Sequence, residues 1–359
     1  MAKTTHGGWP KPARRIGEVW LRFTNAEKKV LTNVSAGTRA DGTLFIAADE
    51  HASINRLVAA EDGPWIEEGS VALRDLLPLA DPDAEADLEG LAADGGWLWV
   101  VGSHARTRAK IAKAPDECID LAALADLKNT RARCLLARVP LVRDGNGWRP
   151  VKADGDRKAG MLRQDKRGNR LARILRHDPL IRPFTRVPAK EGGVDIEGIA
   201  VCGSRVALGL RGPVIGDHAI LLEFSVAAKA SGRLVIASPP VRRLLDLDGL
   251  GIRDLKRCGN DLLILAGPTT ALSGPCALYR WTDWVNDPPR DPDKVRLHRP
   301  DRIVELPFGR GSDHPEGLAL WDDTGSGERR ILVIYDSPDA ARVDAAGAAI
   351  SADVFALPG

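Results

Sequence analysis

The chain has 359 residues, of which 44% are hydrophobic and 28% charged, a composition typical of a folded globular protein rather than a disordered one. Its 51 Lys and Arg residues nearly balance 49 Asp and Glu residues, and the net charge of +2 excludes a protein-wide attraction to nucleic acid. No apolar run is long enough to span a bilayer, and residues 1–16 lack the apolar core of a signal peptide. The sequence therefore predicts a soluble, cytoplasmic protein without a membrane partner.

The first predicted strand lies at residues 17–23, and no earlier strand is available to pair with it. We expect it to complete the last sheet beside residues 350–357, closing a ring without exposed edges. Further strands follow as short runs of Val, Ile, Leu and Trp between Gly, Asp and Pro, as in residues 42–47 and 260–265. The pattern predicts an all-β protein.

Helical patterns are short and local. Leucines recur at every third position in residues 120–128, and Leu171, Ile174 and Leu175 share one side of residues 169–177. Both segments are predicted to be short helical insertions between strands.

Residues 143–190 form a predicted inserted, partly helical segment within a single domain spanning residues 1–359. The part from Arg143 to Arg176 is rich in charged residues and Gly and poor in large apolar residues, so we expect it to project. Its basic run, residues 157–176, is interleaved with acidic residues, which favours a solvated surface over a nucleic-acid site.

One acidic segment recurs along the chain. Its three copies are Asp-Leu-Glu-Gly-Leu-Ala at 87–92, Asp-Ile-Glu-Gly-Ile-Ala at 195–200 and Pro-Glu-Gly-Leu-Ala at 315–319. Residues 249–255 repeat the unit with Arg253 in place of Glu, and residues 42–48 form a weaker copy. The recurrence predicts a β-propeller of five or six blades, because the interval between the first two acidic copies fits one blade with an insertion or two blades.

At these segments the chain resembles a family of bacterial proteins catalogued as a domain of unknown function and expected to adopt a β-propeller. The resemblance rests on residues 188–200, 209–214, 249–255, 315–318 and 335–338. More distantly, the Asp-x-Glu-Gly segment is similar to that of propellers described as esterase-like phytases. That similarity implies a metal-dependent phosphoester or ester hydrolase.

The innermost strands of a propeller line its central channel, so we expect Glu89, Glu197, Arg253 and Glu316 to converge. Converging carboxylates repel one another unless an Arg, a shared proton or a cation offsets their charge. Ca²⁺ and Mg²⁺ prefer such oxygen ligands, and the predicted metal ligands are Glu89, Glu197, Glu316 and Asp336. Alternatively, each Glu accepts backbone N–H groups from the neighbouring blade and only joins the blades.

The predicted catalytic residues are Glu197, Arg253, Arg211 and His104. The fork of Arg211, framed by small residues, suits a phosphate or carboxylate, although Arg211 is equally suited to pair with Glu197 or Glu316. His104 ends a predicted hairpin and is either a base or ligand at neutral pH or only a polar rim residue. His314, just before Glu316, adds a nitrogen ligand at the same rim.

Together these residues predict a propeller that binds a small anionic or phosphorylated ligand at the axial rim. In the leading hypothesis it hydrolyses this ligand with a divalent cation, Ca²⁺ or Mg²⁺, while Arg253 and Arg211 stabilise the developing negative charge. The alternatives are a non-enzymatic scaffold for a protein partner and a sensor that binds a ligand without chemistry.

Overall fold

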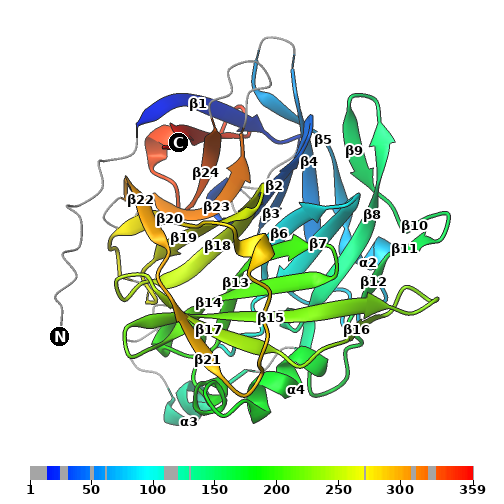
Figure 1. Ribbon diagram of the computed structural model, residues 1–359. Helices are drawn as coiled ribbons and strands as arrows, with labels where there is room; N and C mark the ends of the chain where they lie inside the picture. The colour runs from blue at the N-terminus through cyan, green and yellow to red at the C-terminus, as the bar shows by residue number, and fades with distance from the viewer. Residues whose placement is uncertain are drawn as a thin grey trace.

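The structure is a computed structural model that describes residues 14–24, 31–48, 52–60, 63–108, 120–128, 131–270, 272–308, 313–321 and 329–358. Its main strands form five antiparallel sheets, or blades, arranged around a central axis (Figure 1). The predicted all-β propeller is therefore confirmed.

Each blade contains four main strands, ordered from the innermost to the outermost. Blade 1 contains β2 (Val34–Ala40), β3 (Thr43–Ala48), β4 (Ser53–Ala59) and β5 (Trp65–Ala72). Blade 2 contains β6 (Leu88–Asp94), β7 (Trp97–Gly102), β8 (Leu136–Asp144) and β12 (Gly160–Met161). Blade 3 contains β13 (Asp195–Cys202), β14 (Arg205–Ile215), β15 (His218–Ala228) and β17 (Val241–Asp246). Blade 4 contains β18 (Gly251–Cys258), β19 (Asp261–Gly267), β20 (Cys276–Trp281) and β22 (Asp301–Leu306). Blade 5 contains β23 (His314–Leu320), β24 (Arg330–Asp336), β26 (Ala349–Ala356) and β1 (Arg15–Arg22).

Smaller elements extend the blades or connect them. The additional strands are β9 (Gly147–Pro150), β10 (Ala153–Asp154), β11 (Arg157–Lys158), β16 (Leu234–Ile236), β21 (Val295–His298) and β25 (Val343–Asp344). The α-helices are α2 (Leu73–Leu76), α3 (Leu121–Ala125) and α4 (Arg170–His177). The 3₁₀ helices are η2 (Arg131–Arg133), η3 (Arg182–Arg186), η4 (Ala189–Glu191), η5 (Trp284–Asn286) and η6 (Ala340–Arg342). Among the described residues, no helix combines the length and the hydropathy needed to cross a membrane.

The five innermost strands form a closed ring around the axis. In order, β2 contacts β6, β6 contacts β13, β13 contacts β18, β18 contacts β23, and β23 contacts β2. The long interval between the first two acidic copies thus holds blade 2 with an insertion, because β8 and β12 both belong to that blade.

The N-terminal strand closes the ring as predicted. β1 pairs antiparallel with β26, from Arg15 opposite Phe355 to Arg22 opposite Ala349. In Figure 1 the dark blue β1 lies beside the orange and red C-terminal strands. A short parallel pairing of β1 with β5 also joins the outer edges of blades 5 and 1.

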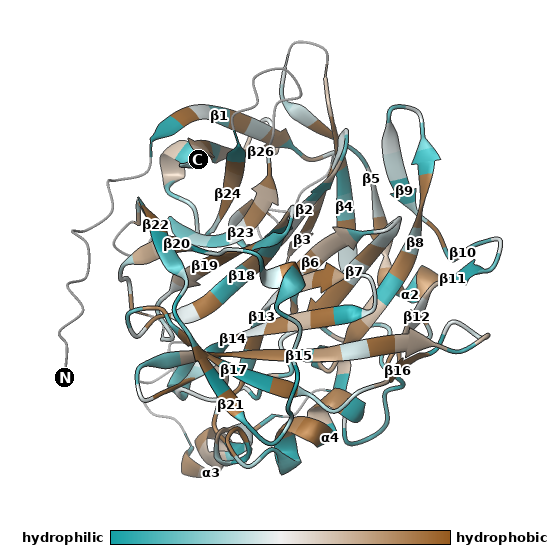
Figure 2. Ribbon diagram, viewed as in Figure 1, coloured by the Kyte–Doolittle hydropathy of each residue, from teal (hydrophilic) through white to brown (hydrophobic). Residues whose placement is uncertain are grey.

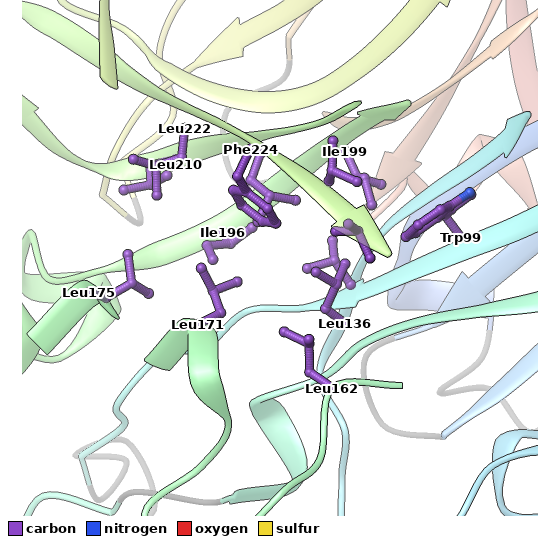
Figure 3. Packing of buried hydrophobic residues seen from close by; sticks show 14 of the residues in the cluster. Trp99, Leu136, Leu162, Leu171, Leu175, Ile196, Ile199, Leu210, Leu222 and Phe224 are labelled. Carbon is purple, nitrogen blue, oxygen red and sulfur yellow. The ribbon is translucent and has the colours of Figure 1, made fainter. Parts of the chain in front are cut away.

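Apolar side chains fill the spaces between neighbouring blades, and strands β7, β15 and β24 are largely brown in Figure 2. Between blades 2 and 3 this core includes α4, whose N-cap Asn169 accepts a hydrogen bond from the Ala172 amide at 2.9 Å. Figure 3 shows Leu171 and Leu175 of α4 pointing toward Ile196 on β13. The expectation that this region projects is wrong for α4, because both leucines are buried in the core.

Candidate functional site

The repeated segments occupy equivalent positions at one end of the ring. In every innermost strand, the pairing with the second strand of the blade skips one residue near the start, which is a β-bulge. The skipped residues are Ser35, Glu89, Glu197, Arg253 and Glu316. Bulges re-aim a side chain and are common beside functional sites. The repeat predicted four of these positions, whereas Ser35 was missed because it shares no charge with the other four.

The glycine after each Glu allows neighbouring innermost strands to approach closely. A Cβ atom on Gly90 would lie 3.1 Å from the Glu197 carbonyl oxygen of the next blade. A Cβ on Gly198 would lie 2.7 Å from Leu255 Cγ, and one on Gly317 would lie 3.2 Å from the Gly37 amide nitrogen. The recurring Glu-Gly pair therefore combines an axial carboxylate with close packing between blades.

Five of the axial side chains form a chain of alternating charge. Arg211 Nη2 lies 2.6 Å from Asp195 Oδ2, and Arg211 Nη1 lies 2.8 Å from Glu197 Oε1. On the other side of Glu197, Arg253 Nε lies 3.1 Å from Oε2, and Arg253 Nη2 pairs with Glu316. The sequence suggested that Arg211 binds an anion or pairs with Glu197 or Glu316, and the structure shows the pairing with Glu197. Asp195, which the sequence showed only as part of the repeat, is a further member of the site.

One group of oxygen atoms has the spacing of a cation site. Ligand atoms of Glu89, Asp195 and Glu197 all lie within 4.8 Å of one another. Oxygens bound to one Ca²⁺ at about 2.3–2.6 Å from the ion have separations of this size or less, so the three residues fit a hard cation. Of the predicted ligands, Glu89 and Glu197 lie in this group together with Asp195, whereas Glu316 pairs with Arg253 and Asp336 lines the pocket described below.

Burial and repulsion change the acidity of this cluster. Burial raises the pKa of Glu197 to about 7, against the opposing effect of Arg211 and Arg253. Burial likewise raises the pKa of Asp87 to about 6, although Arg133 lies 2.7 Å from its carboxylate. Near neutral pH Glu197 therefore takes up a proton readily.

An open pocket of about 180 Å³ lies against this charged chain. Its polar lining consists of Lys190, Arg211, Arg253, Thr270, Ser273, His314, Glu316, Asp336 and Ser337, together with the thiol of Cys276. His314 and Asp336 face each other across β23 and β24. Burial raises the pKa of Asp336, and Arg253 opposes that effect. Among the described residues, His314 Nε2 is buried without a hydrogen-bond partner.

His104 is turned away from this pocket. Its ring contacts the Gly102 carbonyl at 2.9 Å and the Asn169 amide at 3.2 Å, and it lines a separate cavity of about 20 Å³ with Cys134 and Arg176. Burial lowers the pKa of His104 to about 4, so its imidazole is neutral at pH 7. The structure thus separates His104 from the other predicted catalytic residues.

Farther along the axis, a buried ion pair ties three blades together. Lys256 Nζ lies 2.6 Å from both Asp254 carboxylate oxygens and donates across the axis to the Leu91 carbonyl at 3.2 Å. Asp254 also accepts a hydrogen bond from the Leu318 amide at 2.8 Å. Asp254 thus accepts a hydrogen bond from a backbone N–H group of the neighbouring blade, the kind of contact that the sequence suggested for the glutamates.

Comparison with known proteins adds the following findings. Residues 33–353 match the family described as "Protein of unknown function (DUF3616)". Among curated proteins, no sequence matches this chain.

Several solved structures are similar in outline. They include an exo-1,5-alpha-L-arabinanase from a bovine ruminal metagenomic library, with 11% identity, a TM-score of 0.39, and coverage of 92% of this chain and 95% of that one. A Myxococcus xanthus glutaminyl cyclase has 11% identity, a TM-score of 0.43, and coverage of 98% and 100%. An alpha-L-arabinofuranosidase from Clostridium thermocellum has 7% identity, a TM-score of 0.43, and coverage of 89% and 86%. Structural similarity with such low identities and TM-scores gives no evidence about the activity of this chain.

Proposed function

Because the chain belongs to the DUF3616 family, whose description names no activity, we propose its function from the axial pocket. The protein binds a small anionic ligand there and hydrolyses a phosphoester or ester bond in it with the help of a divalent cation. The observation that carries this proposal is that three members of the alternating chain, Arg211, Arg253 and Glu316, line an open pocket.

The basic side chains of the pocket support an anionic ligand. Arg211 and Arg253 each have a planar fork of donors, and Lys190 adds a third positive charge to the lining. Carboxylates hold both guanidinium groups in position, so binding requires little rearrangement of the long arginine side chains.

The acidic residues support a cation beside that ligand. Glu89, Asp195 and Glu197 are the residues that would hold it, and Asp195 and Glu197 share their charge with Arg211. Such an ion supplies Lewis acidity and lowers the pKa of a bound water. Extra positive charge at these carboxylates also weakens their hold on Arg211, which makes the guanidinium donors available to an anion.

His314 and Asp336 are suited to proton transfer in the same pocket. The buried Nε2 atom of His314 has an open hydrogen-bonding position within the described structure, which a water or a ligand oxygen satisfies. Asp336, opposite His314 with a raised pKa, retains a proton to higher pH than an ordinary Asp. Together they are the proposed acid and base that assist bond cleavage.

The test begins with metal-free protein prepared with a chelator. We expect Ca²⁺ or Mg²⁺ to raise the melting temperature, and Glu89→Gln and Asp195→Asn to abolish most of that rise. Asp94→Asn, on the same strand as Glu89 but at its other end, is the matched control and keeps the rise.

Ligand binding is tested separately by calorimetry with inorganic phosphate and phosphomonoesters. Arg253→Met removes a charged hydrogen bond worth about 1.5–3 kcal/mol, so affinity falls roughly tenfold or more. Arg257→Met, on the same strand but paired with Asp94, leaves affinity unchanged. A folded wild type that binds neither cation nor phosphate contradicts the proposal and favours the protein scaffold; binding without turnover of any phosphoester or ester favours the sensor.

A further inference from the structure

The axial pocket has an apolar side in addition to its charged one. Pro268, Leu272 and Phe308 line it, and they follow β19 and β22 of blade 4. Leu272 is 76% exposed and Phe308 is 47% exposed, which places both among the large hydrophobic residues that the described structure leaves in contact with solvent. Both side chains line the same pocket, and ligand pockets in proteins combine apolar side chains with a few charged or polar groups.

The charged side chains of the same pocket restrict the chemical class of that ligand. Lys190, Arg211 and Arg253 line the pocket together with these apolar residues. Inorganic phosphate is small enough to occupy only part of about 180 Å³, which leaves room for a second group. A ligand that satisfies both sides carries an anionic group joined to an apolar one.

We propose that the natural ligands of this pocket are organic phosphate esters with an aryl or alkyl group, whose phosphate meets Arg253 and whose apolar group covers Leu272 and Phe308. This inference rests on the proposed anion binding and adds the substrate class to it. Leu272 and Phe308 then determine specificity, because they contact only the part of the ligand that inorganic phosphate lacks. Arg253 contributes equally to phosphate and to its esters.

The chain offers a matched control for the apolar contact. Leu121 on α3 is 79% exposed, nearly the same as Leu272, but it is not among the residues that line the pocket. Leu121→Ala thus removes an equally exposed apolar side chain without changing the proposed specificity surface.

The experiment compares the dissociation constants of phenyl phosphate and inorganic phosphate for the full chain, measured by calorimetry without added Mg²⁺ so that the proposed hydrolysis does not consume the ester. Wild type is expected to prefer phenyl phosphate by about tenfold or more, since the phenyl group leaves water on binding. The Leu272→Ala/Phe308→Ala variant loses this preference and keeps its affinity for inorganic phosphate. Phe308→Leu, which retains an apolar side chain, keeps most of the preference, and Leu121→Ala keeps all of it.

Three outcomes would overturn the inference. If wild type binds both probes equally, or if the double variant retains the preference, the substrate class is wrong while anion binding stands. If wild type binds neither probe, the proposed function itself fails and the inference fails with it. Thermal unfolding of each variant verifies that it is folded, which is expected because both side chains are largely exposed.

Discussion

Glu197 connects the two arginines of the axial site, and its charge controls both. With Glu197 ionised, Arg211 and Arg253 are fixed on either side of one carboxylate. When Glu197 takes up a proton, both guanidinium groups lose part of their attraction to it. The proposed anion binding is therefore coupled to the charge of Glu197 near its pKa of about 7.

This raised pKa predicts a pH-dependent stability. The folded protein holds the Glu197 proton up to about pH 7, whereas the unfolded chain releases it near the ordinary value of 4.5. Because the folded state binds more protons between these values, the contribution of Glu197 to the unfolding free energy falls as pH rises from about 4.5 to 7. The change is on the order of 3 kcal/mol, at about 1.36 kcal/mol per pH unit.

Urea unfolding of wild type and Glu197→Gln across this pH range measures the effect. The difference in unfolding free energy between the two proteins shifts in favour of the variant as pH rises. Glu191→Gln is the control: Arg108 lowers the pKa of Glu191, so the contribution of Glu191 is already complete above its ordinary value of 4.5 and the difference from wild type stays constant across this range. A difference between wild type and Glu197→Gln that does not vary with pH contradicts the prediction.

At the residue scale, the sequence predicted the convergence of the three glutamates and Arg253 because their neighbours repeat. It did not distinguish a metal set from an ion-pair chain, since the choice depends on which side chain Arg211 and Arg253 reach in space. The position of His104 could not be predicted either. Its backbone has a positive φ of 55° at the end of the hairpin, and its ring lies beside the Asn169 amide. No sequence pattern specifies this conformation.

At the scale of elements, the innermost strands combine two requirements in adjacent residues. The bulge brings one side chain toward the axial site, and the residue after it packs against the next blade. In blade 4 the residue after Arg253 is Asp254, which replaces close glycine packing by a hydrogen bond to the Leu318 amide. The fourth copy of the repeat thus has Asp254 in place of Gly, while Arg253 in place of Glu pairs with Glu197 and Glu316.

The packing role of the glycine is testable at Gly198. In Gly198→Ala the new Cβ would lie 2.7 Å from Leu255 Cγ and 3.1 Å from the Leu255 backbone nitrogen, so the neighbouring strand must shift. We expect a loss of about 1–3 kcal/mol in unfolding free energy, as for other overpacked cores. Gly17→Ala, whose Cβ meets Val354 at an ordinary 3.9 Å, is the control. Equal stability of the two variants in chemical denaturation would exclude this packing role.

For helix α4, the sequence pattern predicted the secondary structure correctly but not the burial of the helix. The spacing of Leu171, Ile174 and Leu175 predicted the helix, and Asn169 caps it. The surrounding arginines suggested a projecting, solvated segment, whereas two leucines were sufficient to fix the helix against β13 and β14. The prediction that this segment projects, which relied on its local density of charged residues, was therefore wrong for α4.

For the whole molecule, the ring depends on a strand from the opposite end of the chain. Leu21 on β1 is fully buried, while the adjacent Trp20 points outward at 36% exposure. The sequence predicted this strand at residues 17–23, and the lack of an earlier strand to pair with it indicated that it pairs with the C-terminal strand. The number of blades stayed open at five or six because an insertion and an additional blade occupy similar lengths of chain.

Leu21→Ala tests the contribution of this closure. Removal of a fully buried leucine side chain is expected to lower the unfolding free energy by about 2–5 kcal/mol. Trp20→Ala, one residue away on the other face, costs much less. Differential scanning calorimetry of both variants provides the measurement, and a larger effect at Trp20 would show that β1 is held by its outer face.

The hydrogen bond of Lys256 across the axis affects how a ligand could reach the pocket. Lys256 is buried and reaches from β18 to the Leu91 carbonyl of β6, so its side chain crosses the axis of the ring. A ligand of the proposed axial pocket would therefore enter and leave at the same end of the ring, the end that carries the repeated segments.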